Sequence, residues 1–364
     1  MRFPEEVLKK RMKSFQEKIS LKGLDGVMLR TMSSYIYFTG IRWLRPALFI
    51  PREGDPIAFI ARNEESGFMK KTWIKNIITY ADGGDLIVNV TKTVREFKIK
   101  KIGMEFGLEK DAFILFYEMF KRLNRNVEVV DVASILAEMR MRKDDYELNA
   151  IRTAGKMAKK AMERALDAIE PGLSETEIAA EAYHTLYKLG SEYPQVYVNA
   201  GPYPRVHGEP HRDSIIKKNT FVTVVISADY NGYYSNMTRT IYVGDNSSIE
   251  AKKAMDCMDE VYNKAVELTR PERNFREVIK ALDEIYAKYD LLDKRLIGYA
   301  HGVGLQTEEV PITTIVQAHR AMRPKPRMVL AMIHAPIMYD GLGQVKKEDT
   351  FIVNDDETLQ NITA

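Results

Sequence analysis

The 364-residue chain has little cysteine, no long apolar run and almost no net charge. Its one cysteine, Cys257, permits no disulfide within the chain, which favours a reducing compartment. Cys257 lies in a helical pattern, which predicts a small packing residue rather than a nucleophile. The N-terminal sequence MRFPEEVLKKRMKSF is amphipathic and has no long apolar core. We therefore expect neither a signal peptide nor a membrane span, and a cytoplasmic protein.

The charge balance excludes other classes of protein. Charged residues make up 29% of the chain, yet the net charge is only +3, too little for a dedicated nucleic-acid binder. The lysine-rich stretches Lys98–Lys101 and Lys346–Lys347 are short, and the pattern predicts solvated surface for both. Hydrophobic residues make up 45% of the chain, which suits two packed α/β domains.

The N-terminal part alternates between helical and strand patterns. A helix is predicted over 3–22, because Leu8, Met12, Phe15 and Ile19 recur at helical spacing. Short apolar runs follow at 26–29, 35–38, 47–50, 57–60 and 77–80, with helical patterns near 67–75 and 90–98. A strand at 101–107, a helix at 110–123 and a strand at 127–132 complete the pattern. This alternation predicts a small α/β domain over residues 1–133.

The C-terminal domain is predicted to span residues 134–364. A long helical tract from Ala133 to Leu166 joins the two domains, and the sequence EPGL ends it. A second helix is predicted over 173–190, with Ser174 as N-cap and Glu177 three residues later as its capping-box partner.

A β-hairpin is predicted between Phe221 and Gly244. The alternating apolar run from Phe221 to Ile226 leads into the sequence Tyr-Asn-Gly-Tyr, and a second run follows from Thr238 to Val243. Two such runs around a glycine predict paired strands joined by a broad turn.

The hairpin sequence GYYSNMTRT is accompanied by four further distinctive segments. These are NAGPYPRVHGEP (199–210), GYAHGVGLQTEEVP (298–311), RPKPRMVLAMIHAPIMY (323–339) and GQVKKEDTFIVN (343–354). Together they resemble the creatinase/aminopeptidase P/prolidase family. The resemblance implies an α/β N-terminal domain of the creatinase type followed by an α+β domain with the pita-bread fold.

The family's peptidases bind two divalent ions through five side chains, including two bridging aspartates on the hairpin. The resemblance places these five ligands at Val225, Asn236, His301, Ile333 and Glu348. Only His301 and Glu348 retain a ligand side chain, whereas two ions need carboxylates that bridge and neutralise them. We therefore expect no two-metal site and no cofactor, or at most one weakly bound divalent ion.

Two neighbouring residues leave this prediction open. A one-residue bulge next to Ile333 would turn His334 inward. Asp229 lies on the same strand face as Val225 and offers a carboxylate. Either residue could restore a metal ligand.

His207 lies in a loop flanked by proline and glycine, and the resemblance places it at a substrate-contacting position. Creatinase, a member that works without metal, cleaves a C–N bond of creatine with a histidine as acid/base. A histidine with a pKa near the working pH suits this proton transfer. The two substrate-binding glutamates of creatinase correspond to Thr238 and Ile333, so creatine itself is not the expected substrate.

Four residues are expected to bind the substrate. The resemblance implies that Arg45 reaches a substrate carboxylate, across a dimer in some members, and arginine suits bidentate carboxylate binding. Glu308 replaces a histidine of the peptidases and favours cationic ligands. His301 and Glu348 complete the polar pocket.

Three hypotheses remain. In the first, the chain is a metal-independent hydrolase of a C–N bond in a small amino-acid-derived substrate, with His207 as acid/base. In the second, it is a non-catalytic pita-bread protein that binds a peptide or small ligand. In the third, it is an Xaa-Pro dipeptidase or aminopeptidase with an altered metal site. In each case we expect a small-molecule or short-peptide ligand, a homodimer, and neither nucleic acid nor membrane as partner.

Overall fold

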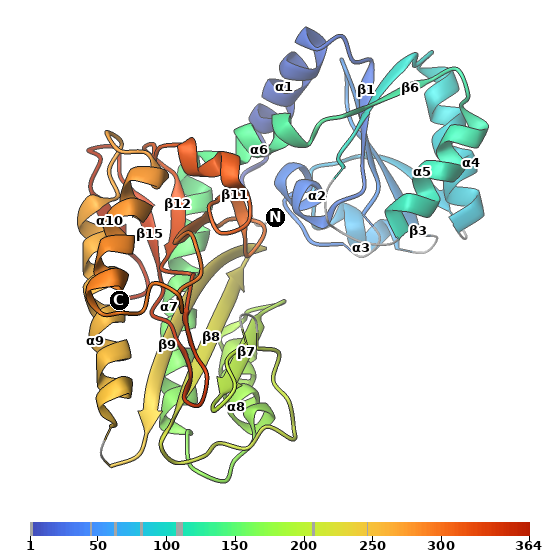
Figure 1. The fold of residues 1–364 in the computed structure, drawn as a ribbon. Coiled ribbons are helices and arrows are strands. Elements are labelled where there is room, and N and C mark those ends of the chain that lie inside the picture. Colours follow the sequence, from blue (N-terminus) through green and yellow to red (C-terminus); the bar gives the residue numbers. More distant parts are fainter. Residues whose placement is uncertain are drawn as a thin grey trace. The chain divides into compact units, whose positions relative to one another are not determined.

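The computed structural model describes residues 3–43, 46–61, 64–80, 83–106, 112–205, 208–245 and 247–364. The chain forms two compact units, Met1–Met139 and Arg140–Ala364, which follow one another along the colour scale of Figure 1. The sequence pattern predicted the boundary slightly earlier, between residues 133 and 134. Helix α6 (Ala133–Met141) carries the chain from one unit into the other.

The N-terminal unit is an α/β domain around one six-stranded sheet, in the order β4-β3-β2-β1-β5-β6. Strands β1 and β2 are antiparallel, whereas β1 and β5 are parallel, so the sheet is mixed. Its strands are β1 (Gly26–Leu29), β2 (Leu48–Pro51), β3 (Ile57–Ala61), β4 (Asn76–Tyr80), β5 (Lys101–Met104) and β6 (Glu128–Asp131). Its helices, besides α6, are α1 (Glu5–Leu21), α2 (Met32–Thr39), α3 (Glu65–Met69), α4 (Gly83–Glu96) and α5 (Ala112–Leu123).

One apolar run of the N-terminal unit forms a helix where the pattern suggested a strand. Residues 35–38 lie in α2, and Tyr35, Ile36, Tyr37 and Phe38 are all buried. A segment that is buried on every side shows no helical periodicity, so its pattern cannot distinguish helix from strand. Gly40 ends the helix in the left-handed conformation, with φ 75°.

The first half of the C-terminal unit packs two helices on a three-stranded sheet. The elements are α7 (Asp145–Asp167), α8 (Glu175–Leu189), β7 (Gln195–Ala200), β8 (Thr220–Tyr230) and β9 (Tyr233–Val243). The predicted continuous helix from Ala133 is wrong, because the chain breaks between α6 and α7. Asp144 begins α7 with a capping box to Glu147, and the predicted capping box of Ser174 and Glu177 begins α8.

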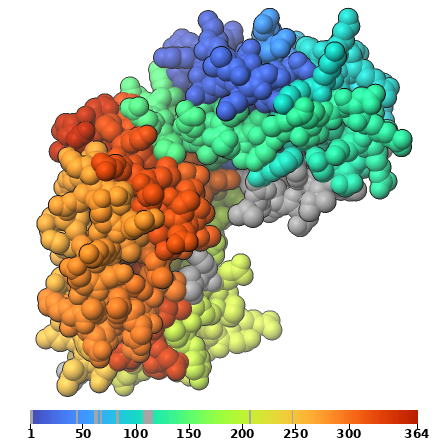
Figure 2. Space-filling view, turned by 45° about the horizontal axis from the view of Figure 1, so that its top comes forward, coloured from blue at the N-terminus to red at the C-terminus, as the bar shows by residue number. Residues whose placement is uncertain are grey.

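The second half repeats the plan of a helix pair with strands. Its helices are α9 (Ile249–Leu268) and α10 (Phe275–Lys288), with a short 3₁₀ helix η1 (Gln317–Ala321). Its strands are β10 (Ala300–Gly302), β11 (Glu309–Ile312), β12 (Val329–Met332), β13 (Ile337–Tyr339), β14 (Gly343–Val345), β15 (Asp349–Val353) and β16 (Leu359–Asn361). Each half has its own apolar core. In the space-filling view, α9 and α10, in orange, form one flank of this unit (Figure 2).

The predicted hairpin is confirmed, although its turn is tighter than expected. Tyr230 pairs directly with Tyr233, and only Asn231 and Gly232 connect the strands. Both have positive φ, 54° and 86°, which asparagine and glycine adopt at low cost. The tight turn lets β8 and β9 pair along their full length.

The two faces of this hairpin have different roles. Val222, Val224, Ile226 and Ala228 contribute to the apolar core under α7 and α8. Because side chains alternate along a strand, Thr223, Val225 and Ser227 face the other way. Their partners on β9 are Thr240, Thr238 and Asn236, so this second face is largely polar. Among the described residues, no helix is both long and apolar enough to cross a bilayer.

Candidate active site

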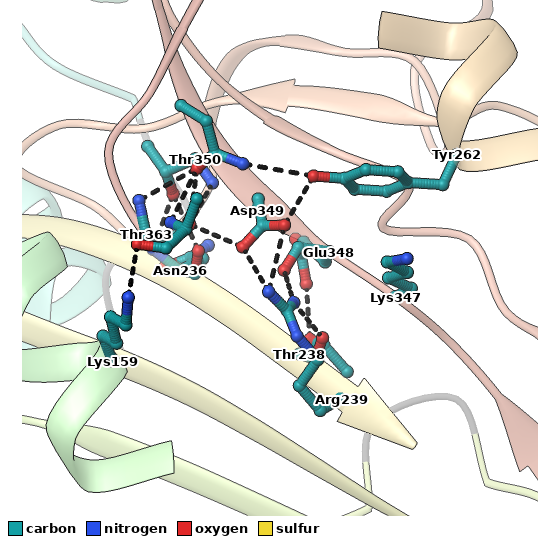
Figure 3. Close-up of polar contacts among 12 residues, drawn as sticks. Lys159, Asn236, Thr238, Arg239, Tyr262, Lys347, Glu348, Asp349, Thr350 and Thr363 are labelled. Carbon is teal, nitrogen blue, oxygen red and sulfur yellow. Dashed lines mark hydrogen bonds and ion pairs between the residues drawn. The ribbon is translucent and has the colours of Figure 1, made fainter. Parts of the chain in front are cut away.

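The two halves of the C-terminal unit meet where Thr238 of β9 pairs with Glu348, just before β15. The backbone N–H of each residue donates to the carbonyl of the other, at 3.0 and 3.1 Å. The hydroxyl of Thr238 also donates to Oε2 of Glu348 at 2.7 Å, as Figure 3 shows. Glu348 is therefore held on the polar face of the hairpin, and its side chain is only 1% exposed.

A second set of contacts fixes the backbone on both sides of this pair. Arg239 donates to the carbonyls of Thr238 and Glu348 at 2.8 and 2.9 Å. Its other terminal nitrogen binds both oxygens of Asp349, which also accepts from the hydroxyl of Tyr262 at 2.6 Å (Figure 3). Burial raises the pKa of Tyr262, and the charge of Asp349 adds to this effect, so the phenol remains a donor. The position of Glu348 is thus set by charge-assisted hydrogen bonds.

Two histidines approach Glu348 from the second half. His301, on β10, places Nε2 at 3.4 Å from Oε1 of Glu348, and Nδ1 of His334 lies 3.3 Å from the same oxygen. The two imidazole rings pack edge to face, with centroids 4.6 Å apart. In the part of the chain that the structure describes, these three side chains form one group whose possible ligand atoms lie within 4.8 Å of one another.

A backbone bulge turns His334 toward Glu348. Ile333 has a φ of 66°, and the backbone N–H groups of both Ile333 and His334 donate to the carbonyl of Tyr299, at 2.7 and 3.0 Å. The Ile333 side chain consequently lies in the apolar core between α9 and β12, while His334 joins the polar cluster. The inward orientation of His334, which the sequence left open, is what the structure has.

Lys346 is buried in this cluster, which corrects the prediction that it lies on the solvated surface. Its side chain is 2% exposed, and Nζ lies 2.9 Å from Oε2 of Glu348 and 3.1 Å from Nδ1 of His334. The neighbouring Lys347 points away and pairs with Asp259 at the surface. Lys346 was not among the predicted site residues, although its spacing of two residues from Glu348 places both side chains on one face of an extended segment.

The remaining positions matched to metal ligands do not supply a carboxylate. Val225 stands opposite Thr238 on the paired strand and offers no donor atom. Asn236 donates from Nδ2 to the carbonyl of Thr307 at 2.9 Å, and its buried Oδ1 accepts no hydrogen bond. Asp229 uses Oδ1 to accept from Ser191, Glu192 and Tyr193, so this carboxylate holds the loop after α8.

Glu308 and Glu309 have separate environments despite being adjacent. Oε1 of Glu308 lies 3.3 Å from Nε2 of His334, and its side chain is 25% exposed. Glu309 is buried and pairs with Arg140 at 2.6 Å. Glu308 therefore extends the polar cluster toward solvent, whereas Glu309 is part of an internal ion pair.

Burial and mutual charge set the ionisation of the cluster. Burial alone would raise the pKa of Glu348, but Lys346 and the two histidines outweigh it and hold the pKa well below its ordinary value. Burial, with the charge of Lys346, lowers the pKa of His334 to about 4. Burial also opposes protonation of His301, but the carboxylate of Glu348, 3.4 Å away, raises its pKa overall.

The donor set does not fit the family's two-ion centre. Glu348 is the one carboxylate left at the five matched positions, and two divalent ions need several bridging carboxylates. A single ion would find His301, His334 and Glu348 within reach of one another. However, Lys346 already contacts the acceptor atoms of two of these three groups.

Two of the predicted site residues, His207 and Arg45, lie outside the described residues. The segments on either side of residues 206–207 are well anchored by Glu175, the first residue of α8. Its buried carboxylate accepts from the backbone N–H groups of Ala200 and His211, at 2.7 and 2.9 Å, and pairs with Arg205.

Comparison with known proteins identifies the family. The model of metallopeptidase family M24 matches residues 149–355, and that of the creatinase/prolidase N-terminal domain matches residues 11–142. The chain belongs to metallopeptidase family M24. An Xaa-Pro dipeptidase of Pyrococcus furiosus is 27% identical over 271 residues, which cover 74% of this chain and 76% of that protein. A creatinase of a Bacillus species is 22% identical, with 99% of this chain and 91% of that protein covered.

The fold of this M24 member agrees with its family. The crystal structure of the prolidase from Pyrococcus horikoshii superposes with a TM-score of 0.86, at 23% identity and with 98% of each chain covered. The predicted pita-bread domain, preceded by an α/β domain, is therefore confirmed. Within that scaffold, the cluster around Glu348 has fewer carboxylates than the two-ion centre of the family's peptidases. A proposed function must be consistent with this difference.

Proposed function

We propose that this M24 protein hydrolyses a C–N bond in a small amino-acid-derived or short-peptide substrate, without a two-ion metal centre. The observation that carries the proposal is the buried cluster of His301, His334 and Glu348, which lies against a hairpin with Val225 and Asn236 at the aspartate positions. The family relationship favours C–N bond hydrolysis, since the relatives include an Xaa-Pro dipeptidase and a creatinase.

His207 is the proposed acid/base. The resemblance of the segment 199–210 to the family supports this role. His334 is the second histidine to test, although its pKa of about 4 makes it a weak base near pH 7. Its contacts with Lys346 and Glu308 would hold its ring in one orientation.

Substrate binding is proposed to combine charges of both signs. Glu308, partly exposed beside His334, would receive a cationic group of the substrate. Arg45 would bind its carboxylate in a bidentate manner, within a homodimer if the arginine comes from the partner. Neither nucleic acid nor membrane is proposed as a partner, and the proposed location is the cytoplasm.

The test is a substrate screen with wild type, His207→Asn, His334→Asn and the control His184→Asn. The panel comprises Xaa-Pro dipeptides, guanidino acids and cyclic amidines, each with and without chelator. If His207 is the acid/base, His207→Asn keeps KM within a few-fold and lowers kcat by about 10²–10⁴. His184 is exposed on α8, so His184→Asn should match wild type.

The outcomes separate the three hypotheses. Turnover that survives chelator and requires His207 supports the proposal, and a requirement for His334 instead transfers the acid/base role. Turnover that disappears in chelator and returns with added metal identifies an Xaa-Pro peptidase with an altered metal site. If the wild type cleaves nothing but binds a panel compound, the chain is a binding protein.

A further inference from the structure

Lys346 is held in the polar cluster by its backbone as well as its side chain. Its N–H donates to the hydroxyl of Thr240 at 2.9 Å, and that hydroxyl donates back to the carbonyl of Lys346 at 2.9 Å. Thr240 lies two residues beyond Thr238 on the same face of β9. The lysine is thus fixed at the junction of the two halves, and its side chain extends to Glu348 and His334.

The contacts of Lys346 determine which nitrogen of His334 carries the proton. The shorter contact of Nδ1 of His334 is with Lys346, at 3.1 Å, against 3.3 Å to Oε1 of Glu348. An ammonium group has only donors, so in this contact Nδ1 accepts a hydrogen bond with its lone pair. In the neutral ring the proton then resides on Nε2, which lies 3.3 Å from Oε1 of Glu308 and can donate to it. Glu308 and Lys346 together select one tautomer of His334.

The same contacts occupy two of the atoms that a divalent ion could use. Oε2 of Glu348 accepts from both Lys346 and Thr238, and the lone pair of Nδ1 of His334 points at Lys346. A metal ion and an ammonium proton cannot use one lone pair at the same time. A divalent ion in this pocket would also be repelled by the lysine charge.

We infer that the ammonium group of Lys346 is the resident cation of this site, and that it excludes a divalent ion from His301, His334 and Glu348. In this arrangement the charge of Glu348 is balanced within the chain itself. This inference goes beyond the proposed function, because it predicts that wild type excludes divalent metal and that removing Lys346 admits it. Both predictions can be tested whether or not a substrate is ever found.

The test compares Lys346→Met with Lys346→Arg and Lys347→Met. Methionine has similar length but no charge, whereas arginine keeps the charge. Lys347→Met is the matched control, because it removes the charge of the neighbouring lysine, which is 34% exposed and points away from the cluster. Chelator-treated protein is titrated with MnCl2, CoCl2 and ZnCl2 by calorimetry, and melting temperature is followed in parallel. Lys346→Met should bind one equivalent of metal and gain several degrees at about 100 times the dissociation constant. The other two variants and wild type should show neither effect.

Metal binding by wild type would overturn the inference. Stoichiometric binding of any of the three metals by wild type, with the affinity of Lys346→Met, would show that the lysine excludes nothing. If Lys346→Met fails to fold in chelator, recovery of folding on metal addition supports the inference, and its absence counts against it. Stoichiometric metal binding by Lys346→Arg would also contradict it, since the excluding charge is retained.

Discussion

Arg140 donates a hydrogen bond of 2.6 Å to Glu309, and both side chains are 7% exposed. Lys143, at 1% exposure, lies 3.7 Å from the other oxygen of the same carboxylate. Two buried cations, one in the last turn of α6 and one between α6 and α7, therefore share one buried anion at the start of β11. This internal pairing separates Glu309 from its neighbour Glu308, which contacts His334 instead.

Glu309→Gln should destabilise the protein by about 3–5 kcal/mol at neutral pH, because it leaves two buried cations without their anion. Burial alone would raise the pKa of Glu309, but Arg140 and Lys143 outweigh it and lower the pKa. The ionised carboxylate therefore stabilises the fold above its unfolded-state pKa of about 4.3. This contribution disappears as the pH falls through the lower folded-state pKa. Urea unfolding of both proteins between neutral and acid pH measures the difference.

The matched control for this prediction is Glu267→Gln. Glu267 pairs with Lys264 on the surface of α9, with side-chain exposures of 63% and 38%. Exposed pairs of this kind contribute about 0–1 kcal/mol, so the control should unfold close to wild type. Equal stability of Glu309→Gln and the control would show that Arg140 and Lys143 do not depend on this carboxylate.

Glu175→Gln should loosen the backbone at Ala200 and at His211. The buried carboxylate of Glu175 accepts from two backbone N–H groups and from Arg205, and an amide can reproduce only part of this set. We expect a loss somewhat below the cost of about 3–5 kcal/mol for a fully buried ion pair, because the side chain of Arg205 is 27% exposed. Amide hydrogen exchange should become faster at Ala200 and His211 in particular.

Glu181→Gln serves as the control on the same helix, since Glu181 pairs with Arg164 at the surface. It should leave exchange at both amides unchanged. Glu175→Gln could instead lower the global stability while exchange at Ala200 and His211 accelerates no more than at the other amides of β7. The carboxylate would then stabilise α8 as a whole and not these two amides in particular.

Local sequence patterns predicted the parts of the fold that local interactions determine. The hairpin follows from alternation and Asn231-Gly232, and the start of α8 follows from the capping box of Ser174 and Glu177. The break before α7 was also encoded locally, because Asp144 and Glu147 have the same spacing. It was missed because the apolar periodicity on both sides continues through it.

The composition of the site depends on contacts that no local pattern encodes. The positive φ of Ile333 decides that His334 rather than Ile333 lies beside Glu348. The burial of Lys346 depends on the pairing of Thr238 with Glu348, which are distant in sequence. The sequence could therefore identify His301 and Glu348 through the family motifs, but it could not show which neighbours complete the cluster.

Cys257 should be unreactive in the native protein. It is buried in the apolar core of α9 and α10, where burial raises the pKa of its thiol to about 12. Because the thiolate is the reactive form, a native thiol with this pKa should react far more slowly than a free cysteine. One equivalent of a disulfide reagent should therefore be consumed in guanidinium chloride and almost none in native buffer. Rapid native labelling at one equivalent would show that this core opens to solvent.

The last prediction tests which of two adjacent positions faces the metal-ligand side of the hairpin. Two quadruple variants share Val225→Asp, Asn236→Asp and Lys346→Met, and they differ in carrying either His334→Glu or Ile333→Glu. Lys346 is removed in both, so that its ammonium group competes in neither. Buried carboxylates without a counter-charge are costly, and both variants should be unstable in chelator.

The His334→Glu variant should recover fully when Mn²⁺ or Co²⁺ is added, because its new carboxylate replaces a side chain that already lies beside Glu348 and is neutralised by the metal. Saturating metal at about 100 times the dissociation constant adds about 2.7 kcal/mol, which is measurable in urea. In the other variant, metal can still bind at His301, His334 and Glu348. However, Ile333→Glu places a charge among buried apolar side chains, where Ile333 is 1% exposed, and the bound metal does not neutralise it, so this variant should stay less stable than the His334→Glu variant. Recovery of the Ile333→Glu variant alone would mean that the bulge at Ile333 is wrongly assigned, and that position 333 rather than 334 is the one that faces the site.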